Sequence, residues 1–187
     1  MAGDRVWWYR TILRSGLVDS EYYAAQRGWR SALTRRAVWD YVTRGHRIGL
    51  SLNPLVDELI AGRDLPEPAR VPALYAYLVS DRATVRINPW WNEPENARYG
   101  DGASTGFLPP LERAWRDRSA VLRLTAGPET TAVSVEEYRG WALKAAHEWA
   151  ALRREGTIRW ARDRTAVKQA EISVVRFLQR QDRESVV

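Results

Sequence analysis

The sequence contains no cysteine and very few lysines and histidines. Cysteine is absent from all 187 residues, which excludes disulfides, thiolate metal sites and a cysteine nucleophile. Lys144 and Lys168 are the only lysines. The two histidines, His46 and His147, have no second histidine at a metal-ligand spacing. A zinc site is therefore not expected, and we expect neither a bound metal nor a cofactor.

Long apolar runs are also missing. The chain has no stretch of about 18 apolar residues, so no transmembrane segment is expected. The first residues, MAGDRVWWYRTILRSG, are charged and aromatic and lack the apolar region of a signal peptide. We therefore expect a cytoplasmic protein, with peripheral contact to a membrane compatible with that location.

Apolar residues, tryptophan and arginine are abundant. Apolar residues make up 45% of the chain, which suits a globular core, and ten of them are tryptophan. Tryptophan serves cores, interfaces and sugar stacking alike. The net charge is +6 and comes almost entirely from arginine. A basic protein can bind nucleic acid, anionic membranes or acidic glycans, but the scatter of these arginines along the chain favours a compositional bias.

Apolar spacing and capping residues predict a mainly α-helical fold. A first helix is expected over residues 4–14. A second helix should be capped by Asp19 and closed by Gly28, since an aspartate caps the first turn and a glycine ends the last. A third helix is expected to begin with Thr34 as its cap and to end at Gly45.

Two stretches of the chain repeat one pattern. Three matches keep their order at a spacing of 35 to 38 residues: Leu17-Val18-Asp19 with Leu55-Val56-Asp57, residues 38–42 with residues 74–78, and Asn53-Pro54 with Asn88-Pro89. Repeats of this length bury their apolar faces against a neighbouring copy. Chance similarity between short amphipathic helices is the alternative. The sequence therefore predicts a short two-repeat helical module over residues 1–92.

The composition changes after Trp91. Residues 93–109 are rich in glycine, asparagine and proline, which predicts a loop-rich linker. A helical region with long C-terminal helices is expected over residues 110–187.

In this region Pro110 is expected to open a helix with Leu111, Trp115 and Leu122 on one face, and residues 125–132 to form a break. Ser134 and Glu137 form a capping box that should open a long helix, with a stripe of Tyr138, Trp141, Ala145 and Trp149. A last helix is expected over residues 157–181, either as a coiled-coil-like arm or packed on its own domain.

The repeat pattern consists of paired aromatics after a Leu-Val-Asp, an aromatic helix, an Arg-Gly turn and an Asn-Pro turn. The structural positions are Asp19, Tyr22, Tyr23, Trp39, Tyr41, Gly45, Asn53, Pro54 and Asp57, with Tyr77, Asn88 and Pro89 in the second copy. Over about residues 12–92 this pattern resembles a helical module that accompanies bacterial glycosyltransferases of surface-polysaccharide biosynthesis. The second copy lacks the Arg-Gly turn and the paired tyrosines, which is expected of a degenerate capping repeat.

The resemblance implies a non-catalytic accessory or N-terminal module of a glycosyltransferase. Its partners would be a glycosyltransferase domain, another protein or an acceptor glycan. It also implies that residues 182–187 lead into the first strand of a nucleotide-sugar-binding domain, with a frayed tail as the alternative. Tryptophan rings stack on sugar faces, so the candidate glycan or partner contacts are Trp90, Trp91, Asn92 and Glu93. Alternatively, these two rings fill the repeat core and cover the linker.

Motifs for catalysis are missing from the sequence. We find no paired carboxylates on a loop for a divalent cation, no glycine-rich phosphate loop and no Gly-x-Ser-x-Gly. No catalytic residue is assigned, and activity as part of a larger glycosyltransferase stays open. A second hypothesis is a basic helical nucleic-acid-binding protein, less favoured, in which phosphates face Arg35, Arg36, Arg44 and Arg47, or the arginines within residues 153–164.

Overall fold

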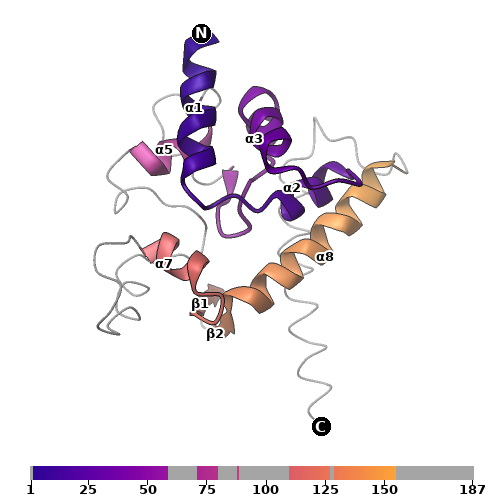
Figure 1. The fold of residues 1–187 in the computed structure, drawn as a ribbon. Helices are drawn as coiled ribbons and strands as arrows, with labels where there is room; N and C mark the ends of the chain where they lie inside the picture. Colours follow the sequence, from indigo (N-terminus) through magenta and orange to yellow (C-terminus); the bar gives the residue numbers. More distant parts are fainter. Residues whose placement is uncertain (1, 59–70, 80–87, 89–109, 127–128, 155–187) are drawn as a thin grey trace.

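The fold is mainly α-helical, as predicted, in the part of the chain that the computed structural model describes: residues 2–58, 71–79, 88, 110–126 and 129–154. Its elements are α1 (Ala2–Arg14), α2 (Ser20–Arg27), α3 (Thr34–Thr43), the 3-10 helix η1 (Gly45–Ile48), α5 (Ala73–Val79), α7 (Pro110–Arg116), β1 (Val121–Ala126), β2 (Glu129–Ser134) and α8 (Val135–Arg154). In Figure 1, α1, α3 and α5 lie in the upper half, and α8 rises diagonally from the hairpin past α2. Among the described residues, no helix combines the length and the apolar character that crossing a bilayer requires.

The ends of α2 are fixed by the residues that the sequence predicts. The Asp19 carboxylate accepts hydrogen bonds from the backbone amides of Glu21 (3.1 Å) and Tyr22 (3.0 Å). At the other end Gly28 has a φ of 67°, in the left-handed region that glycine adopts without strain. Its amide donates to the Ala25 carbonyl at 3.0 Å. Both predicted caps of α2 are confirmed.

The predicted ends of α3 are each displaced. Thr34 is the first helical residue, not the cap, because the extended backbone of the cap position falls on Leu33, which has no side-chain cap bond. The helix ends at Thr43 rather than at Gly45. Gly45 instead opens η1, which is closed by Gly49 at a φ of 80°.

A β-hairpin occupies the segment where the sequence predicted the end of a helix and a break. The strands β1 and β2 are antiparallel, with Val121 opposite Ser134 and Ala126 opposite Glu129. Leu122 therefore lies in a strand and does not extend the face of α7. The prediction of a helix that includes Leu122 is wrong, although the hairpin leaves the fold mainly helical.

A turn after α7 explains this error. The Asp117 carboxylate accepts hydrogen bonds from the amide of Ser119 at 3.1 Å and from its hydroxyl at 2.6 Å. Such local side-chain bonds compete with helical backbone bonds. Five of residues 121–133 are valine or threonine, and β-branched residues favour strands. The turn thus interrupts the helical spacing of the apolar residues.

The predicted capping box of α8 is confirmed. The Ser134 amide donates to the Glu137 carboxylate at 3.1 Å, and the Glu137 amide donates to the Ser134 hydroxyl oxygen at 3.2 Å. The predicted stripe faces the rest of the fold, with three members buried and the tryptophan at position 141 half-buried: Tyr138, Trp141, Ala145 and Trp149. The last predicted helix, residues 157–181, lies outside the described residues.

One hydrophobic cluster contains residues from both predicted regions. Ile12, Tyr41 and Tyr77 from the N-terminal part share it with Trp115 and Tyr138. The predicted linker, residues 93–109, is outside the described part of the chain, so the proposed domain boundary stays a prediction. The shared cluster nevertheless fixes α7 and α8 against the helices that carry the repeat pattern.

Candidate partner-binding surface

The predicted glycan or partner contacts are not among the described residues. These are Trp90, Trp91, Asn92 and Glu93, and Pro89 lies outside as well. Asn88 is described and is buried, so its side chain serves the interior rather than a glycan. The other predicted structural positions are all among the described residues.

The two asparagines of the repeat make the same buried contact. The Asn53 side-chain amide donates to the Leu17 carbonyl at 2.8 Å, and the Asn88 side-chain amide donates to the Leu55 carbonyl at 2.7 Å. Leu17 and Leu55 hold matching positions in the sequence pattern. Each asparagine therefore closes its unit by binding the start of that unit, and leaving either carbonyl unsatisfied would destabilise the fold.

Buried tyrosines form a second recurring contact. Each of three tyrosine hydroxyls that lie in the core donates to a carboxylate: Tyr23 to Asp40 at 2.6 Å, Tyr41 to Glu58 at 2.5 Å and Tyr77 to Glu112 at 3.1 Å. The sequence identified the tyrosines but not their acidic partners, which lie 17 to 35 residues further along the chain. These carboxylates satisfy core hydroxyls and so act in the structure.

Glu58 is buried in a way that suppresses its charge. Burial raises the pKa of Glu58 to about 8, and the hydrogen bonds from the Tyr41 hydroxyl and the Ala73 amide oppose this rise only in part. Burial, together with the nearby carboxyl of Glu58, holds the pKa of Tyr41 well above its usual value. Near neutral pH the carboxyl is therefore mostly protonated, and the pair adds little negative charge to the interior.

Gly45 allows the Tyr23 ring to approach the backbone. A Cβ atom at Gly45 would lie 2.1 Å from the Tyr23 hydroxyl oxygen and 3.0 Å from the ring carbon that bears it. The glycine of the Arg-Gly turn is therefore required for steric reasons, since any larger residue at position 45 would displace the Tyr23–Asp40 hydrogen bond.

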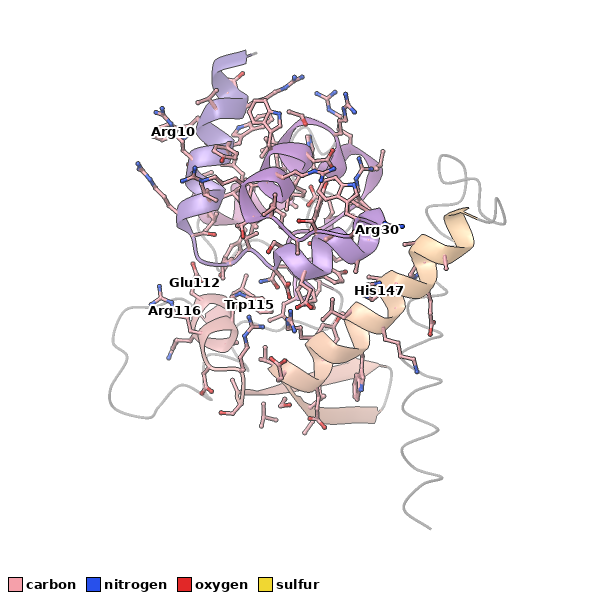
Figure 2. All side chains as sticks on the ribbon, turned by 45° about the vertical axis from the view of Figure 1, so that its right-hand side comes forward. Arg10, Arg30, Glu112, Trp115, Arg116 and His147 are labelled. Carbon is pink, nitrogen blue, oxygen red and sulfur yellow. The ribbon has the colours of Figure 1, made fainter. Side chains whose placement is uncertain are left out.

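Neither histidine forms a metal site with other described residues. His46 is buried, and its Nδ1 lies 2.7 Å from the Tyr41 carbonyl oxygen. Burial lowers the pKa of His46, so the ring is neutral at neutral pH. His147 is exposed on α8 (Figure 2). In the described ranges there is no group of three or more histidine, cysteine, aspartate or glutamate side chains that could hold an ion.

Arg139 connects α8 to the cap of α2. Its Nε lies 2.6 Å from Asp19 Oδ2, and its Nη2 lies 2.5 Å from Glu21 Oε2. The hydrogen bond with Asp19 is the main reason why the pKa of Arg139 is raised. Asp19 thus caps a helix and neutralises an arginine 120 residues away. No local feature of the sequence could have indicated this partner.

The first 58 residues expose arginines and hide most of their acids. The exposed acids there are Asp4 and Glu21, and Glu21 pairs with Arg139. The exposed arginines are Arg10, Arg14, Arg30, Arg35, Arg36, Arg44 and Arg47. Figure 2 shows blue side-chain ends around the upper half of the molecule, with Arg10 and Arg30 labelled. Arginines that are scattered in sequence therefore form a positive surface once the chain is folded.

Part of this surface combines arginine with tryptophan across α1 and α3. Spacing of three and four residues places side chains on one side of a helix. On both helices the opposite side is buried, at Ile12 and at Tyr41. The helices pack together through Tyr9 and Trp39, whose ring centroids are 5.9 Å apart. We name this surface the arginine–tryptophan face, and it consists of Trp7, Arg10, Arg14, Arg35, Arg36 and Trp39.

The two tryptophans of the face are at least half exposed. Trp7 is 61% exposed and Trp39 is 50% exposed, although the resemblance implied a structural role for Trp39. Arg36 extends toward α2 and lies over the Trp29 ring at 4.2 Å from its centroid, a distance that allows a cation–π contact. Large exposed aromatics with cationic neighbours are typical of binding surfaces.

Comparison of the whole chain with models of protein families, with curated proteins and with solved structures found no match.

Proposed function

We propose that this chain is a non-catalytic helical module that serves a bacterial glycosyltransferase of surface-polysaccharide biosynthesis. It would act by contacting the transferase, another protein or the acceptor glycan. The observation that supports this proposal most is the matched pair of buried asparagine contacts, Asn53 with Leu17 and Asn88 with Leu55. They give the residues of the resembling pattern the structural role that such a module requires.

The positions of the carboxylates also support a structural role. A metal-dependent transferase needs free carboxylates near a diphosphate. Here Asp19 pairs with Arg139, Asp40 pairs with Arg27 at 3.0 Å, and Glu58 binds Tyr41. These acids hold elements together, and under this proposal the chemistry belongs to the partner.

Deletion of the gene tests the proposal. The expected result is a clear loss of surface polysaccharide that the intact gene restores, because the transferase would lose its accessory module. A double variant, Asn53→Ala with Asn88→Ala, should fail to restore it. An exposed control, His147→Ala, should restore it fully. Unchanged polysaccharide after deletion would refute the proposal.

Contact with glycan through Trp90 and Trp91 remains a prediction. Tryptophan rings that stack on sugars change their fluorescence when the sugar binds. We expect oligosaccharide from the same surface polymer to quench the fluorescence of the native chain but not of Trp91→Ala. Equal quenching in both proteins would remove these residues as the contact.

The exposed arginines keep nucleic acid as the second candidate. Arg35, Arg36, Arg44 and Arg47 are all exposed, as phosphate contacts would require. Binding through phosphate contacts weakens steeply as salt concentration rises. A titration against duplex DNA at low salt therefore decides, and absence of binding there would exclude this function.

A further inference from the structure

We propose that the arginine–tryptophan face is a docking surface for an anionic membrane. The inference does not depend on the glycosyltransferase proposal, because it uses only exposed side chains of the first 58 residues. The partner is the headgroup layer of a bilayer that contains anionic phospholipid. The arginines would bind lipid phosphates, and the tryptophans would enter the interface.

Charge complementarity is the first argument. The first 58 residues expose seven arginines (Arg10, Arg14, Arg30, Arg35, Arg36, Arg44 and Arg47) and two acids. One of those acids, Glu21, is bound to Arg139. The buried Asp19 is bound to the same arginine, and Asp40 is bound to Arg27. Among the described residues of this part, the exposed side chains therefore carry a net positive charge, and basic residues attract the anionic lipids of a leaflet.

The apolar side chains on and beside the face favour a membrane over other polyanions. Trp7 is 61% exposed, Val6 beside it is 43% exposed, and Leu33 at the start of α3 is 61% exposed. Tryptophan is suited to the boundary between headgroups and acyl chains, and aliphatic side chains insert into that layer. Nucleic acids and glycans stack on aromatic rings, but exposed valine and leucine would add little to their binding.

The row of side chains along α1 fits a broad surface. Trp7, Arg10 and Arg14 follow one line along α1, and Arg35, Arg36 and Trp39 are exposed on the neighbouring helix α3. The Tyr9–Trp39 contact joins the two helices. Helices with tryptophan and basic residues lie in the plane of the interface, and α1 presents such a row.

Sedimentation with lipid vesicles tests the inference. The probes are vesicles of phosphatidylcholine alone and vesicles that also contain phosphatidylglycerol. The intact chain should sediment with the second kind and not with the first at physiological salt. Reversal of two charges, Arg10→Glu with Arg35→Glu, should weaken binding by roughly thirtyfold or more. Trp7→Ala should weaken it too and should reduce the blue shift of tryptophan fluorescence on binding.

The matched control reverses a charge away from the face. Lys144 is exposed on α8, and Lys144→Glu should bind like the native chain. Circular dichroism checks that every variant is folded. The inference would be overturned by no binding to the phosphatidylglycerol vesicles, or by binding that Lys144→Glu weakens as much as the double reversal. Tighter binding of single-stranded DNA or of an acidic polysaccharide than of vesicles would overturn it as well, because a general polyanion site would then explain the charges.

Discussion

Replacement of Glu58 by glutamine should remove a large part of the pH dependence of folding. In the native fold the Glu58 carboxyl is buried, accepts a hydrogen bond from Tyr41 at 2.5 Å and accepts another from the Ala73 amide at 2.8 Å. Glutamine has the same shape and keeps an acceptor for the Ala73 amide. It therefore resembles the protonated acid, and near pH 4.5 the variant and the native chain should have similar stability.

The magnitude follows from the pKa of this carboxyl. In the folded chain it is raised from 4.5 to about 8. Between these values the unfolded chain releases the proton and the folded chain keeps it, so the free energy of unfolding falls as pH rises. One pKa unit corresponds to about 1.4 kcal/mol, so a rise of roughly 3.5 units corresponds to at most about 5 kcal/mol. Above about pH 8 the folded chain also loses the proton and the fall ends.

Urea unfolding at several pH values between about 4.5 and 9 measures this effect. The quantity of interest is the free energy of unfolding of Glu58→Gln minus that of the native chain, which cancels the other titrating groups. It should grow by several kcal/mol toward about pH 8 and then level off. The matched control is Glu148→Gln, the same substitution at an exposed position on α8, and its difference is compared with that of Glu58→Gln. A flat difference for Glu58→Gln would refute the assignment of a buried, protonated carboxyl.

Three further predictions concern single contacts. Asn53→Ala and Asn88→Ala should each lower the free energy of unfolding by about 1 to 3 kcal/mol in urea titrations, since each leaves a buried carbonyl unsatisfied. A loss of stability near zero for one of the two variants would contradict the matched contacts. Gly45→Ala should strongly destabilise the fold. Adding Tyr23→Phe to that variant should recover part of the lost stability, because it removes the closest atom, the Tyr23 hydroxyl oxygen. Purely additive effects of the two substitutions in calorimetry would contradict the clash. Arg139→Met should lower the thermal midpoint and increase amide exchange in α2, because it leaves a carboxylate of the cap without its cation; unchanged exchange there would show that the ion pair is not needed.

Helices and their caps were predictable where one residue acts on its own neighbours. Asp19, Gly28 and the pair Ser134 and Glu137 act within four residues, and the structure confirms all of them. Leu122 was misplaced because a helical spacing of apolar residues does not reveal a turn that interrupts it. The Asp117 side chain forms that turn, and its effect depends on hydrogen bonds that compete with the helix.

The candidate surface was harder to predict because it depends on contacts that are distant in sequence. The arginines are scattered along the chain, which favoured a compositional explanation. In the fold, Asp19 is neutralised by Arg139 and Glu58 is buried, so among the first 58 residues seven exposed arginines stand against two exposed acids. Trp39 belongs to the repeat pattern of the sequence, but its exposure could be known only once its neighbours were placed.

Cross-linking in the organism that encodes the chain tests the central claim most directly. A photoreactive amino acid would replace Val79, Val121 or His147, which are exposed and lie outside the arginine–tryptophan face. After illumination the tagged chain is purified and its cross-linked peptides are identified by mass spectrometry. The account predicts peptides of a glycosyltransferase from at least one position. Recovery of the chain without such peptides at all three positions would contradict it.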